Sequence, residues 1–281
     1  MITPDQLLAR AEQWDISIDE IRETSGSLLA FGSRRDTQVV LKITKKPGDE
    51  WHAGDMLRAF NGDGTVRVYE SEPGAVLLER LNPGNELVEL IRRGEDNAAT
   101  EILAEVIRQT SNHIPPENCP TVLDWARGFD RYVQTGDSRV PQDLVIESGE
   151  LYRRLANSQQ RTMLLHGDLQ HYNVLFDSSR GWIAIDPKGI LGELEYEIGA
   201  ILRNPIEQPE LFISTAVIEQ RLRILTNVLD LNYRRVLEWS FAQAILSAIW
   251  DIEDGFDVAP DHPSLKLAQS IRPLLLKFGG V

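Results

Sequence analysis

Residues 166–173 read His-Gly-Asp-Leu-Gln-His-Tyr-Asn, and residues 183–186 read Ile-Ala-Ile-Asp. Three side chains in this segment carry oxygen atoms at a recognisable spacing: Asn173 stands five positions after Asp168, and Asp186 stands eighteen after it. An aspartate and an asparagine at the first spacing are common by chance and usually form a turn. The His-Gly opening, the spacing and the second Ile-Asp together are much rarer, so this combination determines how we interpret the chain.

Short apolar segments surround these polar residues. They interrupt an otherwise helical pattern at 163–165, 174–176 and 182–185, and their lengths are typical of strands. We therefore expect Asp168 and Asn173 on a loop between two short strands, with Asp186 at the end of a third. Pro187 follows Asp186 and disfavours helical geometry there, which predicts an extended backbone at that aspartate.

The chemistry that suits these residue types is phosphoryl transfer from a nucleotide. Such a reaction needs a carboxylate that orients the attacking hydroxyl, and oxygen ligands that hold magnesium against the phosphates. Asp168 and Asn173 have the D-L-x-x-x-N spacing of a kinase catalytic loop. Carboxylate and amide oxygens also suit Mg²⁺ better than zinc.

The chain before this segment is dominated by strand patterns. A short amphipathic helix capped by Thr3 comes first, and one helix is predicted from about Asp49 to Phe60, after the third strand. The predicted strands are 17–24, 28–33, 37–44, 65–70 and 75–81, separated by Ser-Gly-Ser, Arg-Arg-Asp and Pro-Gly turns.

From Gly84 onward the hydrophobic period becomes helical. Helices are predicted at 121–135, 141–158, 214–229 and 232–252, and the apolar stripe of the last is typical of a protein core. A small sheet followed by a mainly helical body is an α+β arrangement rather than a doubly wound one. The natural boundary at 81–84 predicts an N-terminal lobe of residues 1–81 and a C-terminal lobe of residues 82–281.

Length and charge restrict the class of protein. The chain has 281 residues, near the upper limit for a single core, and a net charge of −14. That acidity disfavours nucleic acid or an anionic membrane as partner. Cys119 is the only cysteine, so no internal disulfide can form. No apolar run reaches the roughly 18 residues of a membrane span, and the first residues lack signal-peptide features. We expect a cytoplasmic monomer.

Three further stretches carry a resemblance to a known family. Residues 182–189 read Trp-Ile-Ala-Ile-Asp-Pro-Lys-Gly, Gly-Glu follows at 192–193, and residues 196–205 read Tyr-Glu-Ile-Gly-Ala-Ile-Leu-Arg-Asn-Pro. With residues 166–173, they resemble the aminoglycoside phosphotransferase family, closest to its streptomycin 6-phosphotransferase and hydroxyurea phosphotransferase branch. The resemblance covers most of the chain but is dense only over 162–205. It implies a bilobal protein-kinase-like fold, in which a small antiparallel N-lobe with one inserted helix precedes a larger, mainly helical C-lobe.

The same resemblance assigns site residues. It implies ATP and Mg²⁺ as cofactors, Asp168 as the catalytic aspartate, and Asn173 and Asp186 as metal ligands. Residues 39–42 resemble the strand that presents the phosphate-binding lysine, so Lys42 would hold the α- and β-phosphates and Glu50 would pair with it. Residues 76–81 match the hinge strand. Further nucleotide contacts would come from the loop Ser25, Gly26 and Ser27 and from the backbone of Glu79 and Leu81.

Acidic residues near the C-terminus suggest what the acceptor is. Residues 186–260 hold 13 Asp and Glu against 6 Lys and Arg. The predicted helix ending near residue 252 finishes in carboxylates, which oppose its dipole by about 0.3–1 kcal/mol each. A bound cation would offset that cost, although a solvated acidic turn is the simpler interpretation. A streptomycin-like aminoglycoside with two guanidinium groups fits such a pocket, with Glu193, Glu197, Asp251 and Glu253 as candidate contacts. Glu197 has a competing role as a brace below the catalytic loop.

Three alternatives remain beside ATP- and Mg-dependent inactivation of an aminoglycoside. A metal-dependent phosphohydrolase with His166, Asp168 and His171 as ligands needs more histidines than the chain supplies downstream. A non-catalytic, nucleotide-binding pseudokinase does not require the retained catalytic residues. A kinase of the same fold acting on hydroxyurea, choline or an amino sugar is the strongest rival, because fold does not determine the acceptor. A protein substrate is disfavoured, since no G-x-G-x-x-G, Asp-Phe-Gly or Ala-Pro-Glu motif is present.

Overall fold

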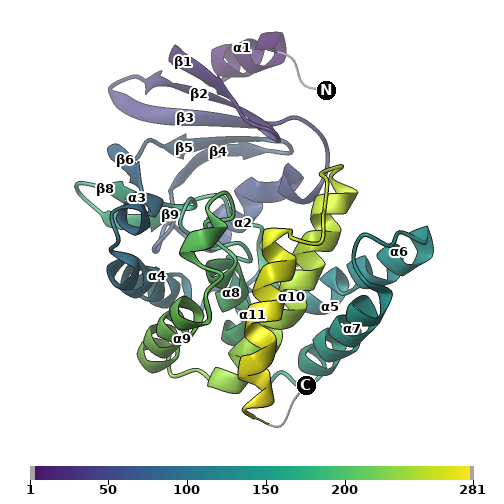
Figure 1. Ribbon diagram of the computed structural model, residues 1–281. Helices are drawn as coiled ribbons and strands as arrows, with labels where there is room; N and C mark the ends of the chain where they lie inside the picture. The colour runs from purple at the N-terminus through teal and green to yellow at the C-terminus, as the bar shows by residue number, and fades with distance from the viewer. Residues whose placement is uncertain (1–3, 279–281) are drawn as a thin grey trace.

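The computed structural model describes residues 4–278, and a five-stranded antiparallel sheet forms its N-terminal part (Figure 1). Helix α1 (Pro4–Gln13) packs on this sheet through Leu7 and Ala11, while Thr3, its predicted cap, lies outside the described residues. The strands are β1 (Ser17–Glu23), β2 (Ser27–Arg34), β3 (Thr37–Thr44), β4 (Val68–Glu72) and β5 (Ala75–Glu79), in the order β1-β2-β3-β5-β4.

One helical segment is inserted between β3 and β4, as predicted. It consists of the short η1 (Asp49–His52) and α2 (Ala53–Ala59), and it lies between the sheet and the helical body (Figure 1). Leu57 of α2 belongs to a buried cluster with Val76 and Leu78 of β5 and with Ile183 of the C-terminal part. We call this group the interlobe cluster, because its apolar contacts join the two lobes.

The fourth strand begins later than predicted. Residue 65 was the expected start, but β4 begins at Val68 because the preceding residues pair with the other lobe. The Val66 N–H donates to Ala184 O at 2.9 Å, and the Ala184 N–H donates to Gly64 O at 2.8 Å. The prediction was wrong because a strand-like sequence gives no information about which partner strand it meets.

The C-terminal part contains two small sheets and a layer of helices. β7 (Met163–Leu165) pairs with β10 (Ile190–Gly192), and a second sheet has the order β6-β8-β9. Its strands are β6 (Pro83–Glu86), β8 (Val174–Asp177) and β9 (Gly181–Ala184). The helices are α3 (Val88–Arg92), α4 (Asp96–Thr110), α5 (Val122–Trp125), α6 (Arg127–Thr135), α7 (Gln142–Ala156), α8 (Leu194–Leu202), η2 (Pro209–Leu211), α9 (Thr215–Leu229), α10 (Tyr233–Glu253) and α11 (Pro263–Leu276).

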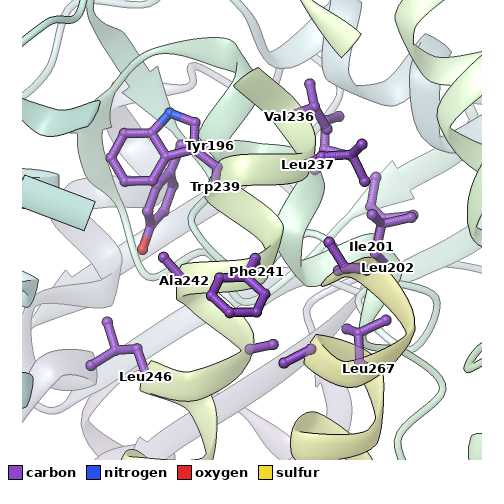
Figure 2. Close-up of a cluster of buried hydrophobic side chains, with 14 of the residues drawn as sticks. Tyr196, Ile201, Leu202, Val236, Leu237, Trp239, Phe241, Ala242, Leu246 and Leu267 are labelled. Carbon is purple, nitrogen blue, oxygen red and sulfur yellow. The ribbon is translucent and has the colours of Figure 1, made fainter. Parts of the chain in front are cut away.

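Helix α10 is the centre of the C-terminal core. Asn232 caps it by accepting a hydrogen bond from the Arg235 N–H at 3.0 Å. Its residues from Val236 to Ile249 are all buried, as expected of a helix surrounded by other elements rather than lying on a surface. Figure 2 shows Trp239, Phe241 and Leu246 of α10 among side chains of α8 and α11. In the described part of the chain, every helix is too short or too polar to cross a membrane.

Candidate active site

The loop from His166 to Asn173 connects β7 to β8 and is fixed from below. Glu197 of α8 accepts hydrogen bonds from the Gly167 N–H at 3.0 Å and the Leu169 N–H at 3.4 Å. Gly167 has a φ of 81°, and a Cβ there would lie 3.0 Å from Ile190, so this position favours glycine. Burial raises the pKa of Glu197 to about 7, against these backbone hydrogen bonds.

The segment around Asp186 is tied to the same loop. The Ile185 N–H donates to Asn173 O, and His166 Nε2 lies 2.9 Å from Ile185 O. Asp186 itself has a φ of 59°, so the predicted extended backbone was wrong. Aspartate tolerates the left-handed region better than most residues, and the hydrogen bonds of its neighbour determine the backbone here more than Pro187 does.

Asp168 lies between an amide and a cation. Asn173 Nδ2 donates to Asp168 O at 2.9 Å and lies 3.3 Å from Asp168 Oδ2. Arg203 Nη2 donates to Asp168 Oδ1 at 3.3 Å. Burial raises the pKa of Asp168, and the Arg203 guanidinium opposes that rise. The carboxylate is thus held in one orientation with its negative charge partly balanced.

Lys42 extends from β3 into the same region and meets two carboxylates. Its Nζ pairs with Glu50 Oε2 at 2.9 Å and with Asp186 Oδ1. Against the effect of burial, these two carboxylates raise the pKa of Lys42. Lys188 Nζ donates to the other oxygen of Glu50 at 2.6 Å. Although burial opposes it, the two lysines lower the pKa of Glu50 to about 2, so Glu50 and both lysines are charged at neutral pH.

The predicted hinge has an unusual hydrogen-bond pattern. The Glu79 N–H donates to Arg67 O at 3.0 Å, but the Arg67 N–H donates to the Glu79 carboxylate at 2.7 Å instead of returning to the Glu79 carbonyl. Arg180 also pairs with that carboxylate. The Glu79 carbonyl is therefore released from its usual antiparallel partner, at the entrance to the interlobe cluster that includes Leu81.

The predicted phosphate loop is a tight turn between β1 and β2. Thr24 N–H donates to Ser27 O at 2.9 Å, and the Lys45 N–H donates to Gly26 O at 2.8 Å. Ser25 and Gly26 are exposed, whereas Ser27 is buried. In this turn, Ser25 and Gly26 are therefore the residues open to a ligand.

The four candidate acceptor residues do not lie together. Glu193 is buried and pairs with Arg235 and Trp239 Nε1 near the start of α10. Asp251 lies sixteen residues after Arg235 on the same helix, which is about 24 Å along its axis. One small pocket cannot include both, so Glu193 has a structural role. Glu197 is the loop brace described above.

Asp251 and Glu253 lie in the last turn of α10 and differ in their partners. Glu253 forms a double hydrogen bond with Arg131, both at 2.9 Å. Asp251 Oδ2 lies 3.4 Å from His262 Nε2 and accepts no hydrogen bond from the described residues. Burial raises the pKa of Asp251, against the charges of His262 and Arg203. The charge of Arg203 therefore lowers the pKa of both Asp251 and Asp168 against the effect of burial.

The donor atoms fit a magnesium ion better than a transition metal. Among residues 4–278, no group of three or more His, Cys, Asp or Glu is arranged to hold a metal. Asp186 and Asn173 supply one carboxylate and one amide oxygen, the latter free because Nδ2 of Asn173 faces Asp168. Mg²⁺ typically uses one or two carboxylates and completes its shell with phosphates and water. Among the described residues, no metal-binding cluster joins His166, Asp168 and His171, so the geometry gives the phosphohydrolase alternative no support.

Sequence reasoning missed Lys188 and Arg203 as members of the site. Both lie within the stretches that carry the family resemblance. However, no local sequence pattern predicts that Arg203 contacts Asp168 or that Lys188 contacts Glu50. Arg203 follows α8 and reaches Asp168 across 35 positions, and Lys188 reaches Glu50 across 138. The sign that could have identified Lys188 is a basic residue two positions after the candidate metal ligand.

The two lobes and the residues between them define a phosphotransferase with a protein-kinase-like fold. A solved structure of aminoglycoside phosphotransferase APH(4)-Ia, in ternary complex with AMP-PNP and hygromycin B, has the same fold, with a TM-score of 0.68, 15% identity and complete coverage of both chains. At that identity the likeness concerns the fold alone.

The sequence comparisons are more specific. The profile of the aminoglycoside/hydroxyurea antibiotic resistance kinase family matches residues 13–255, and the chain belongs to this family of small-molecule kinases. Streptomycin 3''-kinase of Klebsiella pneumoniae is 31% identical over 251 residues, covering 87% of this chain and 91% of that protein. Streptomycin 6-kinase of Streptomyces glaucescens is 27% identical over 280 residues, covering 93% and 86%. These findings confirm the predicted family and fold class.

Proposed function

We propose that this chain transfers the γ-phosphoryl group of ATP, with Mg²⁺, to a hydroxyl of a streptomycin-like aminoglycoside. The observation that carries the proposal is the convergence of Asp168, Asn173, Asp186, Lys42 and Glu50 from four separate segments between the lobes. The names of two relatives, which are streptomycin kinases, favour this acceptor.

The donor nucleotide would lie between the lobes. The apolar interlobe cluster, with Val40, Leu175 and Ile185 at its margin, suits the faces of a purine. The released Glu79 carbonyl and the backbone of Leu81 would contact the adenine edge. Lys42 would hold the α- and β-phosphates, and the exposed turn at Ser25 and Gly26 would cover them.

Catalysis would depend mainly on placement and charge. Asp168 would orient the acceptor hydroxyl and receive its proton, while Arg203 keeps the carboxylate in position. Asp186 and Asn173 would hold Mg²⁺, which neutralises phosphate charge when bound. Glu197 contributes indirectly, because it fixes the backbone of the loop that carries Asp168.

Asp251 is the acidic residue that best fits a cationic acceptor. Its Oδ2 is buried without a hydrogen-bond donor, and a guanidinium can donate two parallel hydrogen bonds to a carboxylate. An acceptor bound there would approach Asp168 from the side of Arg203. We therefore replace the four-residue acceptor prediction with Asp251 as its centre and Glu253 at its edge.

The test is mass spectrometry of streptomycin, hydroxyurea and choline after incubation with the chain, ATP and Mg²⁺. We expect a single phosphoryl addition to streptomycin, and its loss in Asp168→Asn with the ADP affinity unchanged within about threefold. Asp261→Asn, at an exposed ion pair, is the control. Product from hydroxyurea or choline alone would identify that compound, rather than streptomycin, as the acceptor. Bound ATP without any product would favour the pseudokinase alternative.

A further inference from the structure

Lys188 is a second ammonium group between the lobes, and we propose that it contacts the γ-phosphoryl group during transfer. This inference rests on the proposed function and adds a further catalytic residue to it. Its support comes from how the main chain of Lys188 is anchored, where its side chain lies, and what the reaction still lacks.

The main chain of Lys188 is fixed to the catalytic loop. Its N–H donates to His166 O at 2.9 Å, and the next N–H, of Gly189, donates to the same oxygen at 3.0 Å. The Lys188 Cβ lies 3.5 Å from the position that a Cβ of Gly167 would take. Because Gly167 directly precedes Asp168, the base of the Lys188 side chain stays beside the catalytic aspartate.

The side chain of Lys188 shares a carboxylate with Lys42. Glu50 Oε1 accepts from Lys188 Nζ at 2.6 Å, while Lys42 Nζ lies 2.9 Å from Oε2. The Lys188 side chain is 30% exposed, against 11% for Lys42. A lysine has a flexible four-carbon stem, so Lys188 can exchange Glu50 for a phosphate oxygen, whereas Lys42 is also held by Asp186.

The reaction needs a cation that the catalytic loop does not provide. Charge spreads over the equatorial oxygens of the transferring group and calls for donors beyond the metal. Between Asp168 and Asn173, the side chains are Leu169, Gln170, His171 and Tyr172. His171 is fully buried, and burial lowers its pKa well below the usual value. Arg203 is held by Asp168 and Gln243. Among the cationic side chains described between the lobes, Lys188 is both flexible and partly exposed, so it can contact a bound phosphate.

The step itself keeps Lys188 protonated. The acceptor hydroxyl oxygen forms a bond to the γ-phosphorus as the bond from phosphorus to the bridging oxygen breaks. ADP leaves with that electron pair, and the hydroxyl proton passes to Asp168. Lys188 donates hydrogen bonds to a non-bridging oxygen of the transferring group throughout.

Calorimetric titration with Mg·ADP and Mg·AMP-PNP tests the contact without any acceptor. In Lys188→Met, we expect the AMP-PNP affinity to fall about tenfold and the ADP affinity to change less than about twofold, since only the first ligand carries a γ-phosphoryl group. Lys188→Arg should recover part of the difference. Lys277→Met, at a distant surface ion pair with Glu219, is the matched control. A wrong acceptor assignment would leave this result intact.

The same titrations in a Glu50→Gln variant distinguish a direct contact of Lys188 with the γ-phosphoryl group from an indirect effect through Glu50. If Lys188 only positions Glu50, then Lys188→Met should weaken ADP and AMP-PNP equally and add nothing in a Glu50→Gln chain; that result would overturn the proposal. If Lys188 touches the γ-phosphoryl group, the selective loss for AMP-PNP persists in Glu50→Gln. With a working acceptor, kcat should also fall by about 100-fold in Lys188→Met.

Discussion

Glu197 provides a prediction whose size follows from the structure. It is 3% exposed and accepts hydrogen bonds from the backbone of loop 166–173, and burial raises its pKa from 4.5 to about 7. A raised pKa in the folded chain means that this group stabilises the fold fully below pH 4.5, and that this stability is lost as the pH rises through about 7. With about 1.4 kcal/mol for each pKa unit, the loss between pH 5 and pH 8 is about 2.5 kcal/mol.

Glu197→Gln removes this titration while keeping one acceptor oxygen for the Gly167 N–H. Relative to the wild type, the variant should therefore gain about 2.5 kcal/mol of unfolding free energy between pH 5 and pH 8. The amide nitrogen would face a second backbone N–H, so the variant should be less stable than the wild type at pH 5.

Urea unfolding followed by tryptophan fluorescence at pH 5, 6, 7 and 8 measures this difference. Glu219→Gln is the control, because Glu219 lies on α9 and forms an exposed ion pair with Lys277. Its unfolding free energy should differ from that of the wild type by a nearly constant amount, within about 0.5 kcal/mol, from pH 5 to pH 8. Parallel curves for wild type and Glu197→Gln would refute the raised pKa of Glu197.

Three further perturbations test the surroundings of Asp168. Arg203→Met should raise the pKa of Asp168 further and move the acidic limb of the kcat/KM profile to higher pH; an unmoved limb would disprove the coupling. Gly199→Ala places a Cβ 2.2 Å from Gln243 Oε1 and should cost about 1–3 kcal/mol in urea unfolding, against less than about 0.5 for the unobstructed Gly48→Ala. Trp239→Phe leaves Glu193 one donor short and should cost about 1–3 kcal/mol; an unchanged midpoint would show that Arg235 suffices.

The helices that the sequence predicted are long segments with apolar residues at helical spacing. α7, α9 and α10 were found near their expected bounds, whereas α8 and α11 were not predicted. α8 has only nine residues, and those from Tyr196 to Leu202 are all buried, so its short apolar run does not distinguish a helix from a strand. α11 contains Pro273, which normally argues against a helix interior. In both cases packing against α10 determines the structure, and local sequence does not report that packing.

The site divides in the same way. Sequence reasoning grouped Asp168, Asn173 and Asp186 from their spacing. The short strands β8 and β9, which lie between Asn173 and Asp186, bring residues at this spacing together. Lys42 and Glu50 came from their order along the chain. The predicted acceptor residues do not form one pocket, because the length of α10 separates Glu193 from Asp251. A count of acidic residues in the sequence gives no information about the distances between them. Arg203 and Lys188 depend on contacts between distant segments, which no local pattern encodes.

The charges in the cleft explain how an acidic chain can bind a polyanion. The net charge of −14 should repel ATP at long range, but salt screens exposed charges beyond about 8 Å, so the contact residues decide. Lys42 and Lys188 are already paired with Glu50 and Asp186, and these four groups sum to zero charge. Phosphates would therefore bind by exchanging partners with the carboxylates rather than by meeting free cations. If the proposed function holds, such an exchange would release Asp186 for Mg²⁺ when Lys42 turns to the phosphates, and it would couple metal binding to nucleotide binding. The acidic surface would then act on the proposed cationic acceptor, because it would attract that acceptor to a site whose own charges are balanced.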